Sequence, residues 1–300
     1  MHIPDNFLST PVWATLDAVA VGAVGVLARR ASGELEDHHV PLMGVMGAFV
    51  FAAQMINFPV GVGTSGHLLG AALLACTLGP ASAALVMTAI IALQAFVFQD
   101  GGVLALGANI FNMAVAGVLA GYLPFKLWGA GRRRKQAIFA GACLSVLVSA
   151  SLALSELLIS GIRMPRPVIL VSLGLFVVSA LIEGAITVSV VQALEKLNPT
   201  FIQKPDAPRR SALAFLGVGA VLVGTAGFLF ASTAPDGIEH LGIDLGLKAR
   251  TMMHAPLADY ALGSFQSLWL RKASAGLAGL ILIYGICAAA SRWIARQRSA

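Results

Sequence analysis

Charged residues are scarce in this 300-residue chain, since only 11% are Asp, Glu, Lys or Arg whereas 58% are hydrophobic. A soluble domain carries about 25% charged residues, because most of its exterior must face water. The composition therefore argues against a soluble fold and predicts an integral protein of the lipid bilayer. The net charge of +6 arises from basic residues between apolar runs, which is typical of membrane topology and not of nucleic-acid binding.

Cysteine is also rare. The chain has Cys76, Cys143 and Cys287, each inside an apolar run, and it has no C-x-x-C pair. This spacing argues against a disulfide framework and against a thiolate metal site. We expect all three to be small buried hydrophobic residues.

Common catalytic motifs are missing as well. Without a G-x-x-x-x-G-K-[ST] phosphate loop, the chain is not expected to hydrolyse ATP. Neither H-E-x-x-H nor G-x-S-x-G occurs, which argues against an intramembrane enzyme. The N-terminal residues lack a basic stretch, so no cleaved signal peptide is expected.

What the chain has in abundance is long apolar segments. A helix needs about 20 apolar residues to cross the hydrocarbon core. Nine candidates are present: residues 11–28, 40–58, 68–78, 80–98, 103–125, 137–159, 168–194, 212–231 and 273–292. Segment 68–78 is too short to cross alone. It follows a glycine-rich stretch, 59–66, which we expect to dip into a cavity, because irregular backbone at membrane depth must be covered by protein or water.

A linker divides these segments unequally. Three prolines and several polar residues lie within 198–210. We therefore predict a domain of residues 1–205 with about seven segments. Residues 206–300, here called the second module, should form two helices around an outer loop, 232–272. The predicted fold class is an all-α integral membrane protein.

The basic residues predict the orientation. With the N-terminus outside and the C-terminus in the cytoplasm, cytoplasmic segments hold fourteen of the twenty lysines and arginines. The positive-inside rule favours this arrangement. It places Met1, His2 and His67 on the same outer side.

The first two residues can form a chelate. Because His2 is bulky, Met1 is expected to remain with a free amine. This amine, the amide nitrogen of His2 and the His2 imidazole close five- and six-membered rings around one metal ion. A metal that binds a deprotonated amide must accept square-planar geometry, which favours Ni(II) and Cu(II), and low-spin Co(II) can enter too. Zinc prefers tetrahedral sites, and magnesium and calcium prefer oxygen.

A square plane needs a fourth donor, and His67 is the natural candidate. It follows the flexible stretch 63–66, whose glycines let the backbone approach closely. Ser65 or Thr64 could orient the imidazole by a hydrogen bond. A surface or helix-cap histidine is the alternative.

Four motifs resemble one family: MHIPDNFLS at 1–9, QMINFPV at 54–60, GTSGHLLG at 63–70 and QDGGVLALGANIFNM at 99–113. They are similar to the CbiM/NikM family, the substrate-binding components of energy-coupling-factor transporters for cobalt and nickel. The resemblance implies a metal held by the Met1 amine, the His2 amide nitrogen and imidazole, and His67. Asn6 stands where the family has glycine, and asparagine tolerates the left-handed backbone that such a turn needs.

The second module carries its own resemblance. Its segment 234–239, APDGIE, resembles the PDGLE motif of the small CbiN/NikN component, which has two transmembrane helices around an extracytoplasmic loop. The resemblance implies a fusion of the two components, with the second assisting metal loading. A passive tether is the alternative, and His240 and His254 in this loop have no paired spacing that assigns them a role.

The resemblance also implies partners and a location. These are a CbiQ/NikQ-like transmembrane coupling subunit, CbiO/NikO-like ATPase subunits and the bacterial inner membrane, with Ni²⁺ or Co²⁺ as the transported substrate. The alternative function is an ion-coupled secondary transporter that works without an ATPase. It would use the intramembrane carboxylates Asp17, Glu156 and Glu183, although interhelical hydrogen bonds explain such groups too.

Other candidates support the site or a partner. Asn57, Asn109 and Gln99 could fasten the N-terminal segment and the 61–66 loop by hydrogen bonds, or could simply join helices. In the first helix, small residues recur every four positions and make a flat face for another helix: Ala14, Ala18 and Gly22. The resemblance implies that this face docks on the coupling subunit, and packing within the chain is the alternative.

Overall fold

The computed structural model of the protein describes all residues except 35–38, 199–200, 203–209, 264 and 297–300. Seven helical spans within this part are long and apolar enough to cross a membrane. They are α1 (Thr10–Glu34), α4 with η1 (Pro80–Leu93, Gln94–Phe98), α5 with η2 and α6 (Leu106–Asn109, Ile110–Gly117, Val118–Trp128), α7 (Arg134–Ile159), α8 (Arg166–Leu197), α9 with η3 (Arg210–Ala226, Gly227–Leu229) and α11 (Leu268–Arg296). The predicted helical membrane fold is confirmed.

The apolar segment predicted at 40–58 is not one helix. Helix α2 (His39–Gln54) ends early, and an antiparallel hairpin follows, made of β1 (Asn57–Gly61) and β2 (Thr64–His67). Its turn contains Gly63 at φ 69, a left-handed angle that glycine adopts without strain. Strand β2 is buried along its whole length. Pairing between the strands satisfies backbone groups that would otherwise lie unbonded inside the protein.

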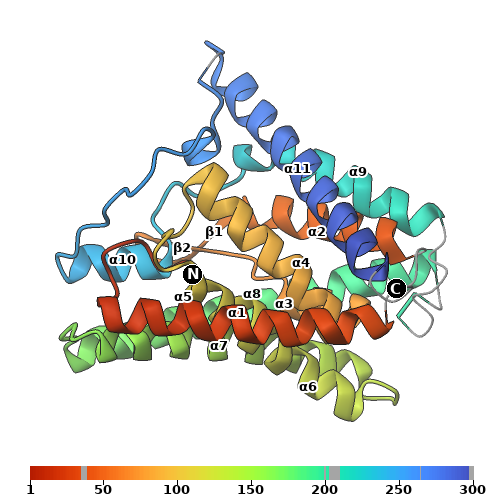
Figure 1. The fold of residues 1–300 in the computed structure, drawn as a ribbon, viewed down its shortest axis with the longest axis horizontal. Coiled ribbons are helices and arrows are strands. Elements are labelled where there is room, and N and C mark those ends of the chain that lie inside the picture. Colours follow the sequence, from red (N-terminus) through yellow and green to blue (C-terminus); the bar gives the residue numbers. More distant parts are fainter. Residues whose placement is uncertain (35–38, 199–200, 203–209, 264, 297–300) are drawn as a thin grey trace.

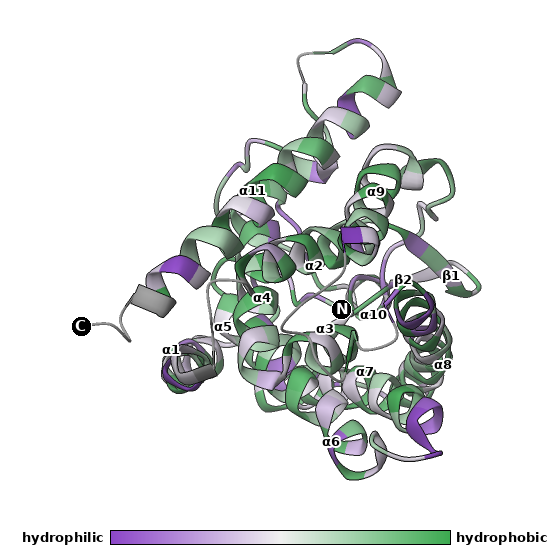
Figure 2. Cartoon of the chain, turned by 90° about the vertical axis from the view of Figure 1, so that its right-hand side faces the viewer, coloured by the Kyte–Doolittle hydropathy of each residue, from purple (hydrophilic) through white to green (hydrophobic). Residues whose placement is uncertain are grey.

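The short helix α3 (Ala71–Leu78) lies at the centre of the molecule. Its first seven residues are all buried, and it packs against α4, α6 and α7 (Figure 2). A side chain of α8 holds the backbone just before this helix: the Glu183 carboxylate accepts hydrogen bonds from the Leu69 and Gly70 amides at 2.7 and 2.8 Å. The buried helix α3 thus begins only four residues after the end of β2 at His67.

The second module packs beside the core. Helices α9 and α11 contact each other and α2, and the chain between them reaches back across the molecule to the short helix α10 (Gly237–Asp244) and the turn η4 (Ala258–Tyr260). Helix α10 lies next to the N-terminal segment (Figure 1). Helix α11 begins at Leu268, five residues before the predicted 273. Most of the predicted linker, with the boundary at 205/206, lies outside the described residues.

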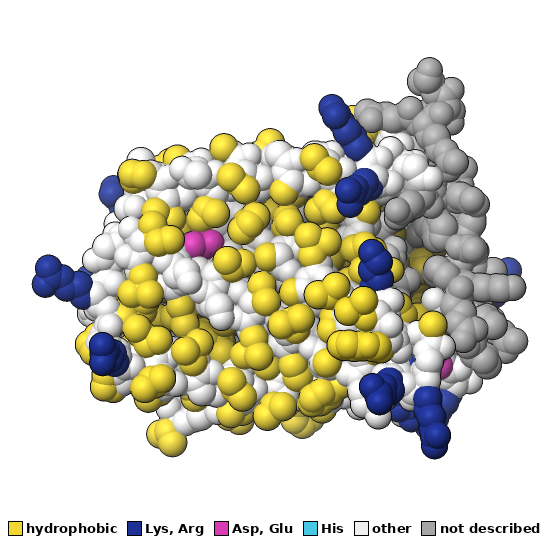
Figure 3. Space-filling model, turned by 90° about the horizontal axis from the view of Figure 1, so that it is seen from below, with side chains coloured by type: hydrophobic (Ala, Val, Ile, Leu, Met, Phe, Trp, Pro, Cys, Tyr) yellow, Lys and Arg dark blue, Asp and Glu magenta, His cyan; other side chains and the backbone are white. Residues whose placement is uncertain are grey.

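The exterior suits a lipid environment. One face of the molecule shows a broad hydrophobic band, with Lys and Arg side chains gathered towards its two ends (Figure 3). Large apolar side chains are exposed on several helices, among them Val21, Leu170, Val218 and Ile281. Such an extended apolar surface is expected where hydrocarbon covers the protein.

The contact between α9 and α11 gives a test of the packing. A Cβ added at Gly276 would collide with the Gly224 carbonyl, whereas one added at Gly285 on the same helix meets nothing within 4 Å. We expect Gly276→Val to destabilise the protein by about 1–3 kcal/mol, as overpacking does. Thermal unfolding in detergent measures the effect. Gly285→Val is the matched control, and equal melting of the two variants would contradict this packing.

Candidate metal centre

The N-terminal segment enters the protein instead of remaining at the surface. Met1, His2 and Ile3 are 8%, 3% and 0% exposed. Asn109 at the end of α5 holds both polar groups of Ile3, accepting from its amide at 2.8 Å and donating to its carbonyl at 3.1 Å. The Gly102 amide also donates to the Ile3 carbonyl at 2.9 Å. These bonds fix the backbone next to the first two residues.

A turn follows immediately. The Asp5 carboxylate accepts hydrogen bonds from the amides of Val103 and Leu104 at 3.0 and 2.7 Å. Asn6 has a left-handed φ of 76, and its side chain donates to the Lys248 carbonyl at 3.2 Å. Asparagine thus adopts the left-handed backbone that this turn was expected to need. The same side chain ties the turn to the second module.

The two glycines of the QDGG motif make room for this segment. Gly101 has a φ of 98, and an added Cβ would lie 3.2 Å from the His2 Cβ. At Gly102 a Cβ would lie 2.6 Å from the Asp5 nitrogen and 2.9 Å from the Pro4 carbonyl carbon. Larger residues at either position would push the N-terminal segment away.

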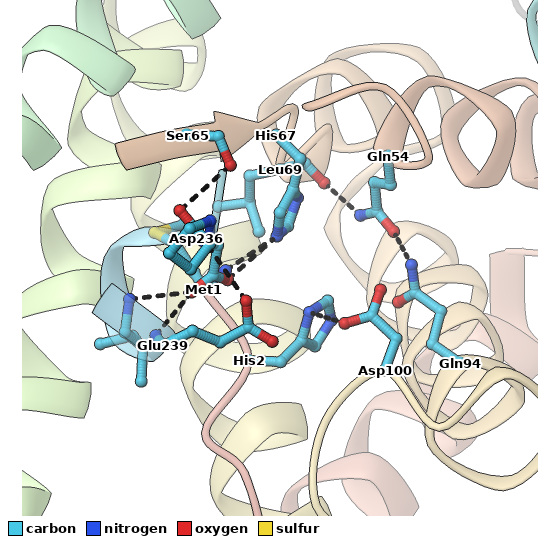
Figure 4. A network of polar contacts seen from close by, with 12 residues as sticks. Met1, His2, Gln54, Ser65, His67, Leu69, Gln94, Asp100, Asp236 and Glu239 are labelled. Atoms are coloured by element: carbon cyan, nitrogen blue, oxygen red, sulfur yellow. Dashed lines mark hydrogen bonds and ion pairs between the residues drawn. The ribbon is translucent and has the colours of Figure 1, made fainter. Parts of the chain in front are cut away.

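The Met1 amine meets His67 inside the protein. Its nitrogen lies 2.8 Å from Nε2 of His67, at the end of β2 (Figure 4). The other ring nitrogen, Nδ1, lies 3.0 Å from the Leu68 carbonyl. A proton on Nδ1 would satisfy that carbonyl and leave the Nε2 lone pair facing the amine. The rings of His2 and His67 are stacked, 5.3 Å apart with an interplanar angle of 15°.

The environment of His67 favours a neutral imidazole ring. Burial lowers the pKa of His67 to about 4, and the Met1 ammonium and His2 act in the same direction. A neutral imidazole is the form that binds metal ions. The arrangement therefore fits coordination better than an ion pair.

His2 contributes a second imidazole. Its Nδ1 lies 3.2 Å from Oδ1 of Asp100 in an ion-pair contact, and neither ring nitrogen forms a well-directed hydrogen bond among the described residues. The Tyr260 hydroxyl donates to the other Asp100 oxygen at 2.6 Å. Burial opposes ionisation of Asp100, but His2, His67 and Tyr260 together lower its pKa below the usual range. A six-membered chelate ring requires Nδ1, so chelation requires His2 to give up Asp100.

Sequence reasoning missed one residue of the site, Asp236. Its Oδ2 contacts the Met1 amine and lies 3.8 Å from Nε2 of His67. Burial favours the neutral acid, but the Met1 ammonium and His67 outweigh it and lower the pKa of Asp236. One ligand atom each from His2, His67 and Asp236 lie within 4.8 Å of one another. Asp236 belongs to the PDGIE motif singled out in the sequence, but a residue so far from Met1 along the chain could not be assigned to the same site.

The predicted supporting residues divide into two groups. Asn109 does fasten the N-terminal segment, as described above. Ser65 and Thr64 do not orient His67: the Ser65 hydroxyl donates to the Ala234 carbonyl at 2.7 Å, and the Thr64 hydroxyl has no hydrogen-bond partner among the described residues. The backbone of Leu68 takes that role instead.

Two further candidates connect the core to the second module. The Gln99 side chain accepts from the Ala255 amide at 3.4 Å. Asn57 lies opposite His67 in the hairpin, and its carbonyl accepts from the Ser232 amide at 2.7 Å. Both residues therefore hold the 232–272 loop near the site, and among the described residues neither forms a hydrogen bond with the Met1 amine.

The intramembrane carboxylates are engaged in hydrogen bonds. Asp17 accepts from the Gly107 amide at 2.7 Å and Glu156 from the Asn112 side chain at 2.8 Å. Glu183, as noted, holds the backbone after His67. All three join separate elements of the fold, which favours the interhelical hydrogen-bond interpretation over a carrier that uses these groups for transport.

The small-residue stripe of α1 faces outward. Ala14, Ala18 and Gly22 are exposed, and a Cβ added at Gly22 would meet nothing within 4 Å. The alternative of packing within the chain is therefore wrong for the part of the protein described.

In the outer loop, His240 lies 3.6 Å from Asp244, and His254 is exposed. Neither histidine belongs to the buried cluster.

Comparisons with known proteins relate this chain to metal transport proteins. The model of a protein family described as CbiM, cobalt uptake substrate-specific transmembrane region, matches residues 2–201. A relative from Archaeoglobus fulgidus, whose name describes a fused nickel transport protein NikMN, is 31% identical over 98% of this chain and 99% of its own length. The cobalt transport protein CbiM of Salmonella typhimurium is 30% identical over 68% of this chain and 87% of its own length. A crystal structure of a truncated transition metal transporter is 31% identical, covers 65% of this chain and 99% of its own, and has a TM-score of 0.58.

Gly102 offers a test of the site's assembly. We expect Gly102→Ala to displace the N-terminal segment and to lower Ni²⁺ affinity by about tenfold or more, the range seen when supporting groups of a metal site are altered. Calorimetric titration of the purified chain measures the affinity. Gly174→Ala on α8, where a Cβ meets nothing within 4 Å, is the control. Unchanged affinity of Gly102→Ala would contradict the close approach described here.

Proposed function

Because this chain belongs to the CbiM family of cobalt-uptake transmembrane proteins, we propose that it is the substrate-binding membrane subunit of an importer for Ni²⁺ or Co²⁺. The observation that carries the proposal is the burial of the Met1 amine 2.8 Å from Nε2 of His67. A charged chain terminus is costly to bury, and chain ends usually fray at the surface. A function that needs the amine inside explains the arrangement.

The proposed ligand set is four nitrogens. They are the Met1 amine, the His2 amide nitrogen, the His2 imidazole and Nε2 of His67. The stacked rings and the buried amine already lie close together, so capture requires only local movement, chiefly of His2 away from Asp100. A square of nitrogens including an amide suits Ni²⁺ and low-spin Co²⁺ and disfavours zinc, magnesium and calcium.

The proposed transport is driven by partners. The coupling subunit and the ATPases of an energy-coupling-factor complex would supply the energy for release into the cytoplasm, and the chain would lie in a bacterial inner membrane with its N-terminus outside. The exposed stripe of Ala14, Ala18 and Gly22 supports a docking face on α1, because small residues allow close approach of another helix. The multi-pass membrane character supports the location.

Blocking the nitrogens tests the proposal directly. We expect His67→Ala, and separately a short N-terminal extension that removes the free Met1 amine, to lower Ni²⁺ and Co²⁺ affinity by about 100-fold or more, because a chelate that loses one donor loses its closed geometry. Calorimetric titration and cellular metal uptake provide the readouts. His254→Ala, at an exposed histidine, is the matched control. Full binding by the extended chain would exclude the amine as a ligand.

The ligand set also predicts how affinity varies with pH. Capture displaces one proton from the Met1 ammonium and one from the His2 amide. His67 releases none above about pH 5, because its pKa is lowered to about 4. We therefore expect the logarithm of the association constant to rise by about two per pH unit between about pH 6 and 7.5. Affinity independent of pH from about 5 to 8 would contradict the amide ligand.

A further inference from the structure

The buried carboxylate of Asp236 occupies a special place between the second module and the nitrogens of the core. Its Oδ2 contacts the Met1 amine, and its Oδ1 accepts from the amides of Ile238 and Glu239 at 2.8 and 2.9 Å, capping α10. The Glu239 side chain completes a capping box by accepting from the Asp236 amide at 3.1 Å. One oxygen is thus used by the helix, and the other faces the site.

The segment that carries Asp236 is fixed to the strand that carries His67. The Ser65 amide donates to the Pro235 carbonyl at 2.9 Å, and the Ser65 hydroxyl donates to the Ala234 carbonyl at 2.7 Å. Ser65 lies two residues before His67 in β2. These two hydrogen bonds of Ser65 therefore hold the Asp236 carboxylate close to His67.

Asp236 lines two cavities that adjoin the site. A cavity of about 380 Å³ reaches His2, and a second of about 400 Å³ reaches His67. Each is lined by Asp100, Asp236 and Glu239. An ion in either cavity therefore lies among these carboxylate oxygens as well as a histidine ring. The Nε2 atom of His2, in a residue 97% buried, has no hydrogen-bond partner in the described part of the chain, and His2 lines the first of these cavities.

The net charge beside Asp236 differs little between the empty and the loaded site. In the empty site it faces one positive charge, that of the Met1 ammonium. Ni²⁺ bound by a neutral amine, two neutral imidazoles and one deprotonated amide also carries one net positive charge. Removing the carboxylate should therefore affect both end states similarly. Between them, when the dication has arrived and the amine still holds its proton, the positive charge is largest and a nearby carboxylate stabilises it most.

We propose that Asp236 is a transfer ligand, whose Oδ2 binds the incoming hydrated ion and passes it to the nitrogens of Met1, His2 and His67. The inference rests on the proposed function. A water ligand leaves as the bond to Oδ2 forms. That bond breaks as the amine and amide nitrogens bind, and their two protons pass to water in the cavities. The proton on Nδ1 of His2, beside Asp100, moves through water to Nε2 of the same ring, so that the Nδ1 lone pair can bind the ion with no further net loss of protons. The second module thus acts chemically in loading and is not a passive tether.

The variant Asp236→Asn tests this role. Asparagine is as good a helix N-cap as aspartate, so α10 should persist while the charge is lost. In stopped-flow mixing of the full chain with Ni²⁺, we expect the loading rate to fall by about tenfold or more and the equilibrium affinity to change by less than about threefold. The visible spectrum at saturation should match that of the wild type, because the final donors are unchanged. Asp236→Ser, another good cap, should behave alike.

Asp244→Asn is the matched control, because Asp244 lies on the same helix with a side chain 48% exposed. It should load at the wild-type rate. A normal rate for Asp236→Asn would overturn the proposal. So would an affinity loss that parallels the rate loss with an altered spectrum, since Asp236 would then be a permanent ligand.

The effect of His67→Ala separates two kinds of failure. If that variant loses Ni²⁺ binding while Asp236→Asn loads normally, only the transfer role is wrong. If Ni²⁺ binds equally well to His67→Ala, the nitrogen site and the transfer role are both wrong.

Discussion

The pair of hydrogen bonds between Asn109 and the backbone of Ile3 is the interaction on which the site depends. Chain ends usually fray, because few contacts offset the entropy of ordering them. Here a side-chain amide satisfies both polar groups of a fully buried residue, and the Asp5 carboxylate repeats the device two residues later. With the backbone held at these points, Met1 and His2 have little freedom. The Met1 amine is thus held beside His67 in the empty site, and such preorganisation would reduce the entropic cost of binding an ion.

The polar groups inside the membrane domain serve the same purpose. Glu183 holds the backbone between His67 and α3, and Asp17 holds the backbone of α5 near Asn109. Buried carboxylates are costly unless they are hydrogen-bonded. Each of these accepts from an amide that starts or supports an element of the site. The candidate metal centre is therefore supported by hydrogen bonds that extend well beyond Met1, His2 and His67.

The sequence alone allowed Met1, His2 and His67 to be placed together, whereas it did not reveal the hairpin or Asp236. Chelation by Met1 and His2 follows from the chemistry of two adjacent residues, so it could be proposed without a fold. The hairpin was missed because residues 40–58 form one apolar run, and burial alone does not separate a strand from a helix. Ser65 was assigned to His67 because they are close in sequence, but its actual partners are Ala234 and Pro235. Asp236 could not be predicted, because 235 positions separate it from Met1 and no local pattern reports such a contact.

The attachment of the Asp236 segment to strand β2 has a consequence for assembly. When the carboxylate and the nitrogens belong to one polypeptide, their encounter is intramolecular, and its effective concentration is set by the chain and not by how many copies the cell makes. Dilution in the bilayer cannot separate them. A transporter built from two separate polypeptides would have to match their synthesis and survive their dissociation, whereas this chain carries a fixed one-to-one stoichiometry in its covalent structure.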